Sequence, residues 1–162
     1  MKELRQIRDA VIGALQDAGL EAEAAFPERR ARKHTGAFAC VAVGAAEGKA
    51  VGFCNYLGEA PGRDGVSREL YGKHLEGEVI VEIRAESARD CDCGCETASG
   101  VLLGGLPEGI RPGGLKWEAL CWDKALQLFL RRGRLSCTAL FTASAGEEDE
   151  FLDFILKGAV LD

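Results

Sequence analysis

The sequence predicts an α+β fold, in which an antiparallel or mixed β-sheet carries two main helices packed on it. Three observations predict it: an amphipathic helical pattern at the N-terminus, a strand of alternating polarity from Glu78 to Arg84, and a second helical pattern directly after that strand. We expect residues 1–162 to form a single domain, because a chain of 162 residues can bury one core but not comfortably two.

The first helix is predicted from Lys2 to Ala18, because apolar residues recur there every three or four positions and charged residues occupy the other face. The apolar positions are Leu4, Ile7, Val11, Ile12 and Leu15. Gly19 is a natural C-terminal end for this helix. The residues from Leu20 to Phe26 then predict a short strand that ends at Pro27, whose missing backbone donor suits an edge or a strand end.

A hairpin and a loop are expected next. The apolar stretches Ala37 to Ala45 and Ala50 to Leu57 both favour strands, and the turn-forming residues Glu47 to Lys49 lie between them. The segment from Gly58 to Ser67 holds the strongest cluster of chain-breaking residues in the sequence, with glycines, a proline and an aspartate. We expect this segment to be a mobile loop.

The strand from Glu78 to Arg84 has one apolar face and one mostly charged face, with Ile80 as the exception. The apolar face consists of Val79, Val81, Ile83 and Ala85, and the other face of Glu78, Glu82, Arg84 and Glu86. Such alternation is typical of a half-buried strand in an antiparallel sheet. Ser87 and Asp90 then resemble a capping box, and apolar residues at helical spacing predict a helix from Asp90 to Leu103.

Glycines and prolines between Gly104 and Gly114 are expected to stop regular structure before a strand from Leu115 to Trp122 begins. Trp117 and Trp122, five apart in one strand, would face opposite sides of the sheet. Two possibilities follow: one tryptophan is exposed and serves as an interface anchor, or both are covered by the helices.

The C-terminal part of the chain contains one clear strand and several ambiguous segments. Residues Arg134 to Thr142 alternate most cleanly, with Leu135, Cys137, Ala139 and Phe141 on the apolar face. The segment from Lys124 to Arg132 fits a short strand or a helical turn equally well. The acidic run from Glu147 to Glu150 predicts a solvated turn, and Phe151 to Leu161 favours a final strand over a helix.

The composition excludes several classes of protein. With 47% apolar and 28% charged residues the chain is typical of a globular protein, and it contains no apolar run long enough to cross a membrane. The net charge of −6 disfavours a protein that binds nucleic acid by neutralising phosphates. A local basic cluster (Arg29, Arg30, Arg32 and Lys33) is interpreted as a solvated loop, with contact to a polyanion or an acidic partner surface as the alternative.

Cys91, Cys93 and Cys95 form the most unusual local pattern, because they are spaced by two at the start of a predicted helix. A helix N-terminus favours thiolates, so a reactive or metal-binding cluster is physically possible. The spacing does not match a zinc site, and the other cysteines (Cys40, Cys54, Cys121 and Cys137) lie singly in expected strands. We therefore expect Cys95 in the core, Cys91 and Cys93 near the surface, and most of the cysteines as reduced thiols.

No other pattern of residues predicts a reaction. The two histidines, His34 and His74, are expected at the surface without a catalytic partner, and no phosphate-binding glycine loop occurs. We thus predict no catalytic, cofactor-binding or metal-binding residues, no cofactor, and a protein that is not an enzyme.

The order of elements resembles small proteins encoded in the tail modules of tailed bacteriophages and prophages, in particular the tail terminator or tail completion group. The resemblance covers most of the chain but includes no diagnostic motif. It rests on the opening helix closed by Ala18-Gly19-Leu20, a strand reaching Pro27, a strand pair around Gly48, the strand Glu78 to Arg84 with the helix Asp90 to Leu103, and closing strands with Leu128 to Gly133.

The resemblance implies a tail-terminator-like fold and a structural protein of virion assembly. Such a protein would form a homo-oligomeric ring, typically a hexamer, at the head-proximal end of the tail tube. There it would stop tube polymerisation and contact the neck or connector proteins, without sequence-specific nucleic-acid binding and without a membrane. It would act in the cytoplasm of the bacterial host during assembly and then reside in the virion tail.

Two other functions stay open at this point. One is a small cytoplasmic metal- or thiol-dependent protein that uses Cys91, Cys93 and Cys95. The other is a host-derived oligomeric binding module unrelated to phages.

Overall fold

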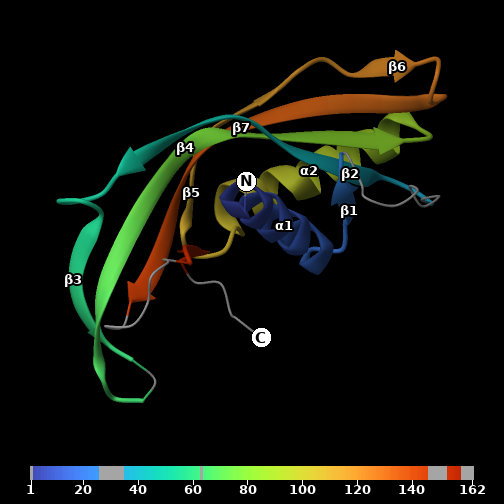
Figure 1. The fold of residues 1–162 in the computed structure, drawn as a ribbon. Helices are drawn as coiled ribbons and strands as arrows, with labels where there is room; N and C mark the ends of the chain where they lie inside the picture. The colour runs from blue at the N-terminus through green and yellow to red at the C-terminus, as the bar shows by residue number, and fades with distance from the viewer. Residues whose placement is uncertain (1, 26–34, 63, 146–152, 158–162) are drawn as a thin grey trace.

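The computed structural model describes residues 2–25, 35–62, 64–145 and 153–157 of the chain (Figure 1). This part of the chain forms two helices, each followed by four strands, which confirms the predicted α+β fold. In chain order the elements are α1 (Lys2–Asp17), β1 (Glu21–Ala24), β2 (Phe38–Ala50), β3 (Tyr56–Pro61), β4 (Ser67–Ala85), α2 (Ala88–Gly104), β5 (Ile110–Trp117), β6 (Cys121–Asp123), β7 (Leu128–Ala145) and β8 (Ile155–Leu156).

All eight strands belong to one mixed sheet whose main order is β1-β2-β4-β7-β5. The β1–β2 pair is parallel, and every other pair is antiparallel. β3 pairs with β4 beyond the end of β2, while β6 and β8 pair with β7 on either side of β5. The two longest strands, β4 and β7, keep one unbroken register from Glu69 opposite Ala145 to Ala85 opposite Phe129.

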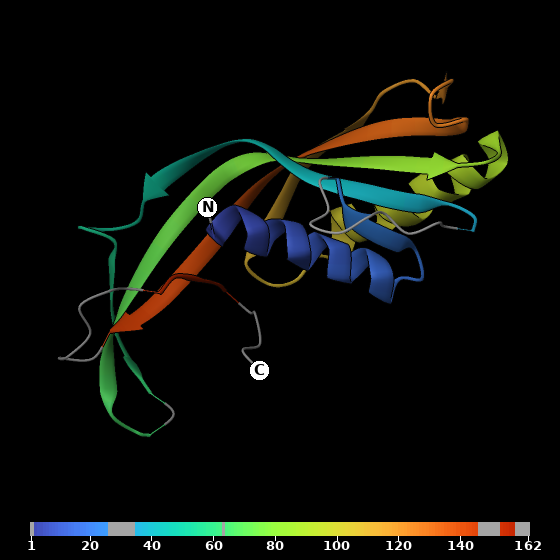
Figure 2. The same ribbon diagram turned by 45° about the vertical axis from the view of Figure 1, so that its right-hand side comes forward.

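Both helices lie on the same side of the sheet, inside its curvature (Figure 1). The far ends of β4 and β7, together with β3, extend beyond the helices, and a second view shows the same extension (Figure 2). The molecule thus consists of a two-layer body and a projecting piece of sheet.

The core forms where the helices cover the inner face of β4 and β7. The predicted apolar faces of both strands are confirmed: Val79, Val81, Ile83, Ala85, Leu135, Ala139 and Phe141 are fully buried there, and Cys137 is nearly so. On the outer face Glu82 is only 9% exposed, and its carboxylate accepts hydrogen bonds from Arg84 and Arg132. The alternation read from the sequence therefore separates an apolar inner face from a charge-paired outer face.

The two predicted helices are both present, with the ends that the sequence indicates. α1 buries Ile7, Val11 and Leu15 and ends before Gly19, which adopts a φ of +86°. α2 begins after Ser87, whose hydroxyl accepts a hydrogen bond from the Asp90 backbone at 3.1 Å.

α2 approaches the sheet closely because it carries Gly94 on its buried face. A Cβ at this position would lie 2.8 Å from Cγ2 of Ile83 and 3.1 Å from Cβ of Ala37. Further along the helix, Trp117 of β5 donates its indole N–H to the Ser99 hydroxyl at 2.9 Å. These contacts fix the distance and the orientation of α2 on the sheet.

The predicted hairpin around Gly48 is wrong. β2 runs straight through Glu47 to Lys49, because these residues pair with β4 and the Lys49 ammonium lies 2.8 Å from Glu76. The chain leaves the sheet only at residues 51–55 and returns as β3, which pairs with the same edge of β4 as β2 does. β3 is therefore a continuation of β2 along β4, separated from it by a five-residue excursion.

The expected loop from Gly58 to Ser67 is a β-hairpin instead. β3 extends to Pro61 and β4 begins at Ser67, so only residues 62–66 form the connection. Gly58 adopts a φ of +118° at an irregularity in the β3–β4 register, and Pro61 stands at the strand end. The chain-breaking residues mark a bulge and a strand end here.

Several details of the C-terminal half also differ from the prediction. β5 already begins at Ile110, so residues 112–114 form an irregularity inside a strand. Trp117 and Trp122 lie in separate strands: Trp117 is partly buried, and Trp122 is 50% exposed beside Phe129. The ambiguous segment from Lys124 to Arg132 is a turn over residues 124–127 followed by the start of β7.

Some predictions fall outside the described residues. These are the basic cluster at 29–33, His34, Pro27, the acidic run from Glu147 to Glu150, and most of the segment from Phe151 to Leu161. Within that last segment the structure describes a short strand, β8.

We predict that Gly94→Val destabilises the protein by about 1–3 kcal/mol, because the added side chain must displace Ile83 and Ala37. The matched control is Gly100→Val on the same helix, where a Cβ meets nothing within 4 Å. That variant should stay within about 0.5 kcal/mol of the wild type in urea denaturation. Equal destabilisation by both substitutions would contradict the close approach of α2.

Candidate functional site

The strongest candidate for a functional surface is the part of the sheet that extends beyond the helices. We call it the β-arm and define it as residues 51–62, 64–71 and 143–145, which comprise the excursion, β3 and the adjoining ends of β4 and β7 (Figure 2). Its exposed large apolar side chains are Phe53, Tyr56, Leu57 and Val66. Apolar groups gathered on a projecting element are typical of a protein–protein contact.

Phe53 is the most exposed of these side chains, at 87%. It lies in the excursion between β2 and β3, and hydrogen bonds close this excursion. The Asn55 side chain accepts from the Val51 backbone at 3.0 Å, and the Tyr56 backbone donates to the Phe53 carbonyl at 2.9 Å. Phe53 is thus presented to solvent by a closed turn.

The turn that presents Phe53 also has a strained backbone. Cys54 and Asn55 have φ values of 50° and 64°, in the left-handed region that residues other than glycine rarely adopt. A hydrogen bond of 2.8 Å from the Gly72 backbone to the Asn55 carbonyl ties the turn to β4. Strain held in place by surrounding hydrogen bonds is common where a protein presents a group for binding.

The base of the β-arm is supported by packing between β3 and β4. The rings of Tyr56 and Tyr71 meet edge to face, with centroids 5.7 Å apart. On the other face Leu57 covers Gly72 so closely that a Cβ there would lie 2.6 Å from a Leu57 methyl. The β-arm therefore has side-chain packing of its own on both faces.

Two carboxylates lie directly opposite each other on the β-arm. Glu59 of β3 and Glu69 of β4 are register partners. Each accepts a hydrogen bond from a hydroxyl, that of Ser67 at 3.3 Å and that of Tyr71 at 2.7 Å, and the Glu69 carboxylate raises the pKa of Tyr71. Among the described residues neither carboxylate has a cation within ion-pair distance. Like charges opposite each other destabilise a strand pair.

Several charged groups elsewhere on the sheet are paired. Arg134 of β7 lies 2.8 Å from Glu78 and 3.0 Å from Glu118, and its hydrogen bond lowers the pKa of Glu118. Glu82 is likewise matched by Arg84 and Arg132. The pair on the β-arm contrasts with this neutralised outer face.

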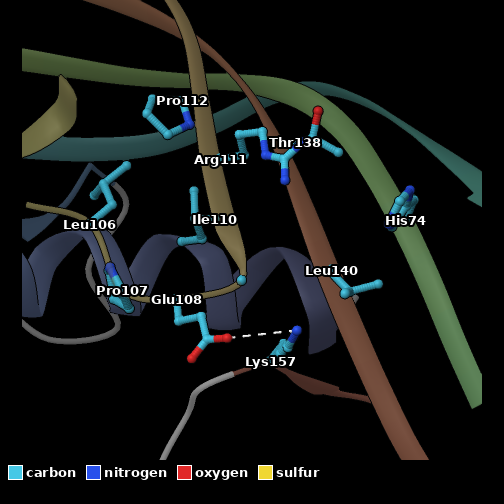
Figure 3. Close-up of a pocket in the computed structure, with 11 residues that line it drawn as sticks. His74, Leu106, Pro107, Glu108, Ile110, Arg111, Pro112, Thr138, Leu140 and Lys157 are labelled. Carbon is cyan, nitrogen blue, oxygen red and sulfur yellow. Dashed lines mark ion pairs between the residues drawn. The ribbon is translucent and has the colours of Figure 1, made fainter. Parts of the chain in front are cut away.

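A cavity of about 460 Å³ lies where the start of β5 meets β7 and β8 (Figure 3). We call it the Arg111 cavity; its apolar lining includes Leu106, Pro107, Ile110 and Leu140, and its polar lining includes His74, Arg111, Thr138, Glu108 and Lys157. Glu108 and Lys157 form an ion pair of 3.6 Å on one side, while Arg111 lies beside Thr138 on another (Figure 3). Within the described chain Arg111 has no ion-pair partner.

Gly109 allows the cavity to form. Its φ of +98° brings the chain into β5 next to β8, and a Cβ at this position would collide with the Lys157 carbonyl. Its own carbonyl accepts from the Leu140 backbone at 2.8 Å. His74, expected at the surface, is half buried on β4 and contributes to this cavity.

The cysteine pattern does not form a reactive cluster in the structure. Cys95 is buried and Cys93 exposed, as predicted, but the prediction of a surface position for Cys91 is wrong: it is fully buried, with its sulfur 3.5 Å from the Ile83 carbonyl. It lies one helical turn before Cys95, so the buried stripe of α2 starts earlier than the sequence pattern indicated.

Burial makes the buried thiols poor nucleophiles. Desolvation raises the pKa of Cys95 to about 12 and raises the pKa of Cys91, and the pKa of Cys40 rises to about 11 for the same reason. In the described part of the chain no group of three or more His, Cys, Asp or Glu residues is arranged to hold a metal ion. Neither described helix has the length and apolarity needed to cross a bilayer.

No protein-family model matches the chain, and a search of curated proteins finds no similar sequence.

We predict that a thiol reagent such as Ellman's reagent labels only Cys54, Cys93 and Cys121 rapidly in the native protein, because these are the exposed thiols. The four buried thiols should react only after denaturation, when all seven are counted. Peptide mapping of the labelled sites makes the measurement specific. Rapid native labelling of Cys91 or Cys95 would contradict their burial and favour the thiol-dependent function.

Proposed function

We propose that this chain is a structural virion assembly protein of a tailed bacteriophage or prophage, a tail terminator or tail completion protein. It forms a homo-oligomeric ring, possibly a hexamer, at the head-proximal end of the tail tube. The observation that carries the proposal is the β-arm, which holds exposed apolar side chains, and two carboxylates with no cation partner among the described residues, away from the body of the molecule.

A ring requires contacts between two different surfaces of each subunit, because a self-complementary contact stops at the dimer. The β-arm and the Arg111 cavity supply two such surfaces, and they lie on different parts of the sheet. The edges of the sheet add further contact sites: among the described strands none pairs with the outer edge of β3 or with the outer edge of β2 after its contact with β1. Unpaired edges are ready sites for strand addition.

The charge of the chain also suits a ring through which DNA passes. With a net charge of −6, the subunit repels the phosphate backbone, so DNA would slide along the channel without sticking to it. The partners in this proposal are further copies of the chain, the tail tube and the neck or connector proteins. The site of action is the bacterial host cytoplasm during assembly and then the virion tail.

In this proposal the protein works by assembly and catalyses no reaction. The thiol-dependent alternative receives less support, since burial raises the pKa of Cys91 and Cys95 and only Cys93 of the three is exposed. The contact element that the expected loop at Gly58 to Ser67 would have supplied is, in this account, the hairpin of the β-arm.

Electron microscopy of particles made without this gene tests the proposal. We expect tails of uncontrolled length or tails that fail to join heads, because nothing would end tube growth or complete the junction. Supplying the wild-type gene from a plasmid should restore normal particles.

Normal infectious particles in the absence of the gene would contradict the proposed function. Tails of normal length joined to heads, with a defect only in later infection steps, would contradict it as well.

A further inference from the structure

We propose that the β-arm of one copy docks into the Arg111 cavity of a second copy, so that copies join head to tail. Phe53 meets the apolar lining of the cavity, and the Glu59–Glu69 pair faces Arg111. This inference deepens the proposed function, on which it rests, by naming the two surfaces that join neighbouring subunits.

Apolar complementarity is the first argument. Phe53 is 87% exposed on a turn whose strained backbone is held by hydrogen bonds. The cavity of about 460 Å³ is in the size range of pockets that receive a bulky group, and Leu106, Ile110 and Leu140 provide apolar surface in it. An aromatic anchor seated in a pocket is the usual centre of a strong protein interface.

Charge complementarity is the second argument. Glu59 and Glu69 lie opposite each other without a cation among the described residues, and Arg111 lines the cavity without a described carboxylate partner. Most other ionic groups on the described sheet are already paired, as for Arg134 and Glu82. A guanidinium placed between two carboxylates would offset their repulsion. The docked state would therefore stabilise a pair that is unfavourable in the free subunit.

The side of the sheet on which each residue lies determines which surfaces meet in the contact. Lys73 of β4 contacts Glu3 of α1 at 3.1 Å, so the odd-numbered residues of β4, including Glu69, are on the helix side. His74 and its register partner Leu140 are consequently on the opposite side. The cavity lies around the β5 edge of the sheet, because Ile110 shares the helix side with its register partner Ala139 whereas Arg111 shares the outer side with Thr138. Docking joins the Glu59–Glu69 face of one β-arm to this edge of the next sheet, which is a heterologous contact and can close into a ring.

The test uses sedimentation or native mass spectrometry of the full chain with Phe53→Ser and Arg111→Glu. Both residues are exposed, so urea midpoints should match the wild type. The wild type should self-associate, and each variant should assemble about tenfold more weakly or worse. Leu103→Ser, which removes a 52% exposed leucine on α2, is the matched control and should assemble normally.

Mixing the two variants gives the sharpest result. The Phe53→Ser variant keeps an intact cavity, and the Arg111→Glu variant keeps an intact β-arm. One contact between the two variants is therefore possible, so the mixture should form heterodimers and nothing larger. Rings or longer assemblies in the mixture would overturn the head-to-tail docking.

A charge exchange separates docking from folding. Glu59→Lys places a cation opposite Glu69, so the monomer should be as stable as the wild type or more stable, while assembly weakens. Combining Glu59→Lys and Glu69→Lys with Arg111→Glu should restore assembly, because both charges of the pair and the charge in the cavity are then reversed together. Failure of this rescue would overturn the assignment of the partners.

The outcomes distinguish the docking from the proposed function. Wild-type rings that persist in both single variants would overturn the docking and leave the function in place. A wild-type protein that stays monomeric at every concentration tested would also overturn the docking, whereas normal particles without the gene would overturn only the function.

Discussion

The unbroken pairing of β4 with β7 is the constraint on which the rest of the structure depends. The two strands share one register from Ala85 opposite Phe129 to Glu69 opposite Ala145, and every other strand except β1 pairs directly with one of them. Because the helices cover only part of this length, the same ladder that forms the core also builds the β-arm (Figure 2). The strands that form the core therefore continue without a break into the β-arm.

This continuity explains how the β-arm forms paired strands although no helix covers it. Its backbone is hydrogen-bonded to the strands of the core, and Lys73 anchors its base through Glu3 of α1 and the ring of Phe154. Beyond this point the alternation of the strands continues, but its inner side chains, such as Tyr71, meet other strands instead of a helix. Exposed apolar and acidic groups there are a direct result of the strand length.

The sequence predicted those elements whose signal is local. The helices α1 and α2 and the alternating faces of β4 and β7 were correct, because a repeat of 3.6 or 2.0 residues reports which face is buried. Gly48 was misread as a turn because its pairing partner, Leu75, is distant in the sequence. Gly58 and Pro61 were misread as a loop, since a bulge and a strand end use the same residues as a turn.

The candidate surface was less predictable than the fold. The Arg111 cavity joins residues from β4, the segment before β5, β7 and β8, and no sequence spacing links them. The opposition of Glu59 and Glu69 depends on the β3–β4 register, which the loop interpretation excluded. The apolar residues between Phe53 and Leu57 were evident in the sequence, but they were assigned to the second strand of the expected hairpin.

Hydrogen–deuterium exchange of the wild-type chain, compared between dilute monomer and concentrated assembly, tests most directly whether the β-arm is the assembly element. We expect the amides of residues 51–62 and those of residues 106–112 to gain protection together, because they belong to the two sides of one contact. Protection that increases only at β1 or α1, with both of these segments unchanged, would contradict the account.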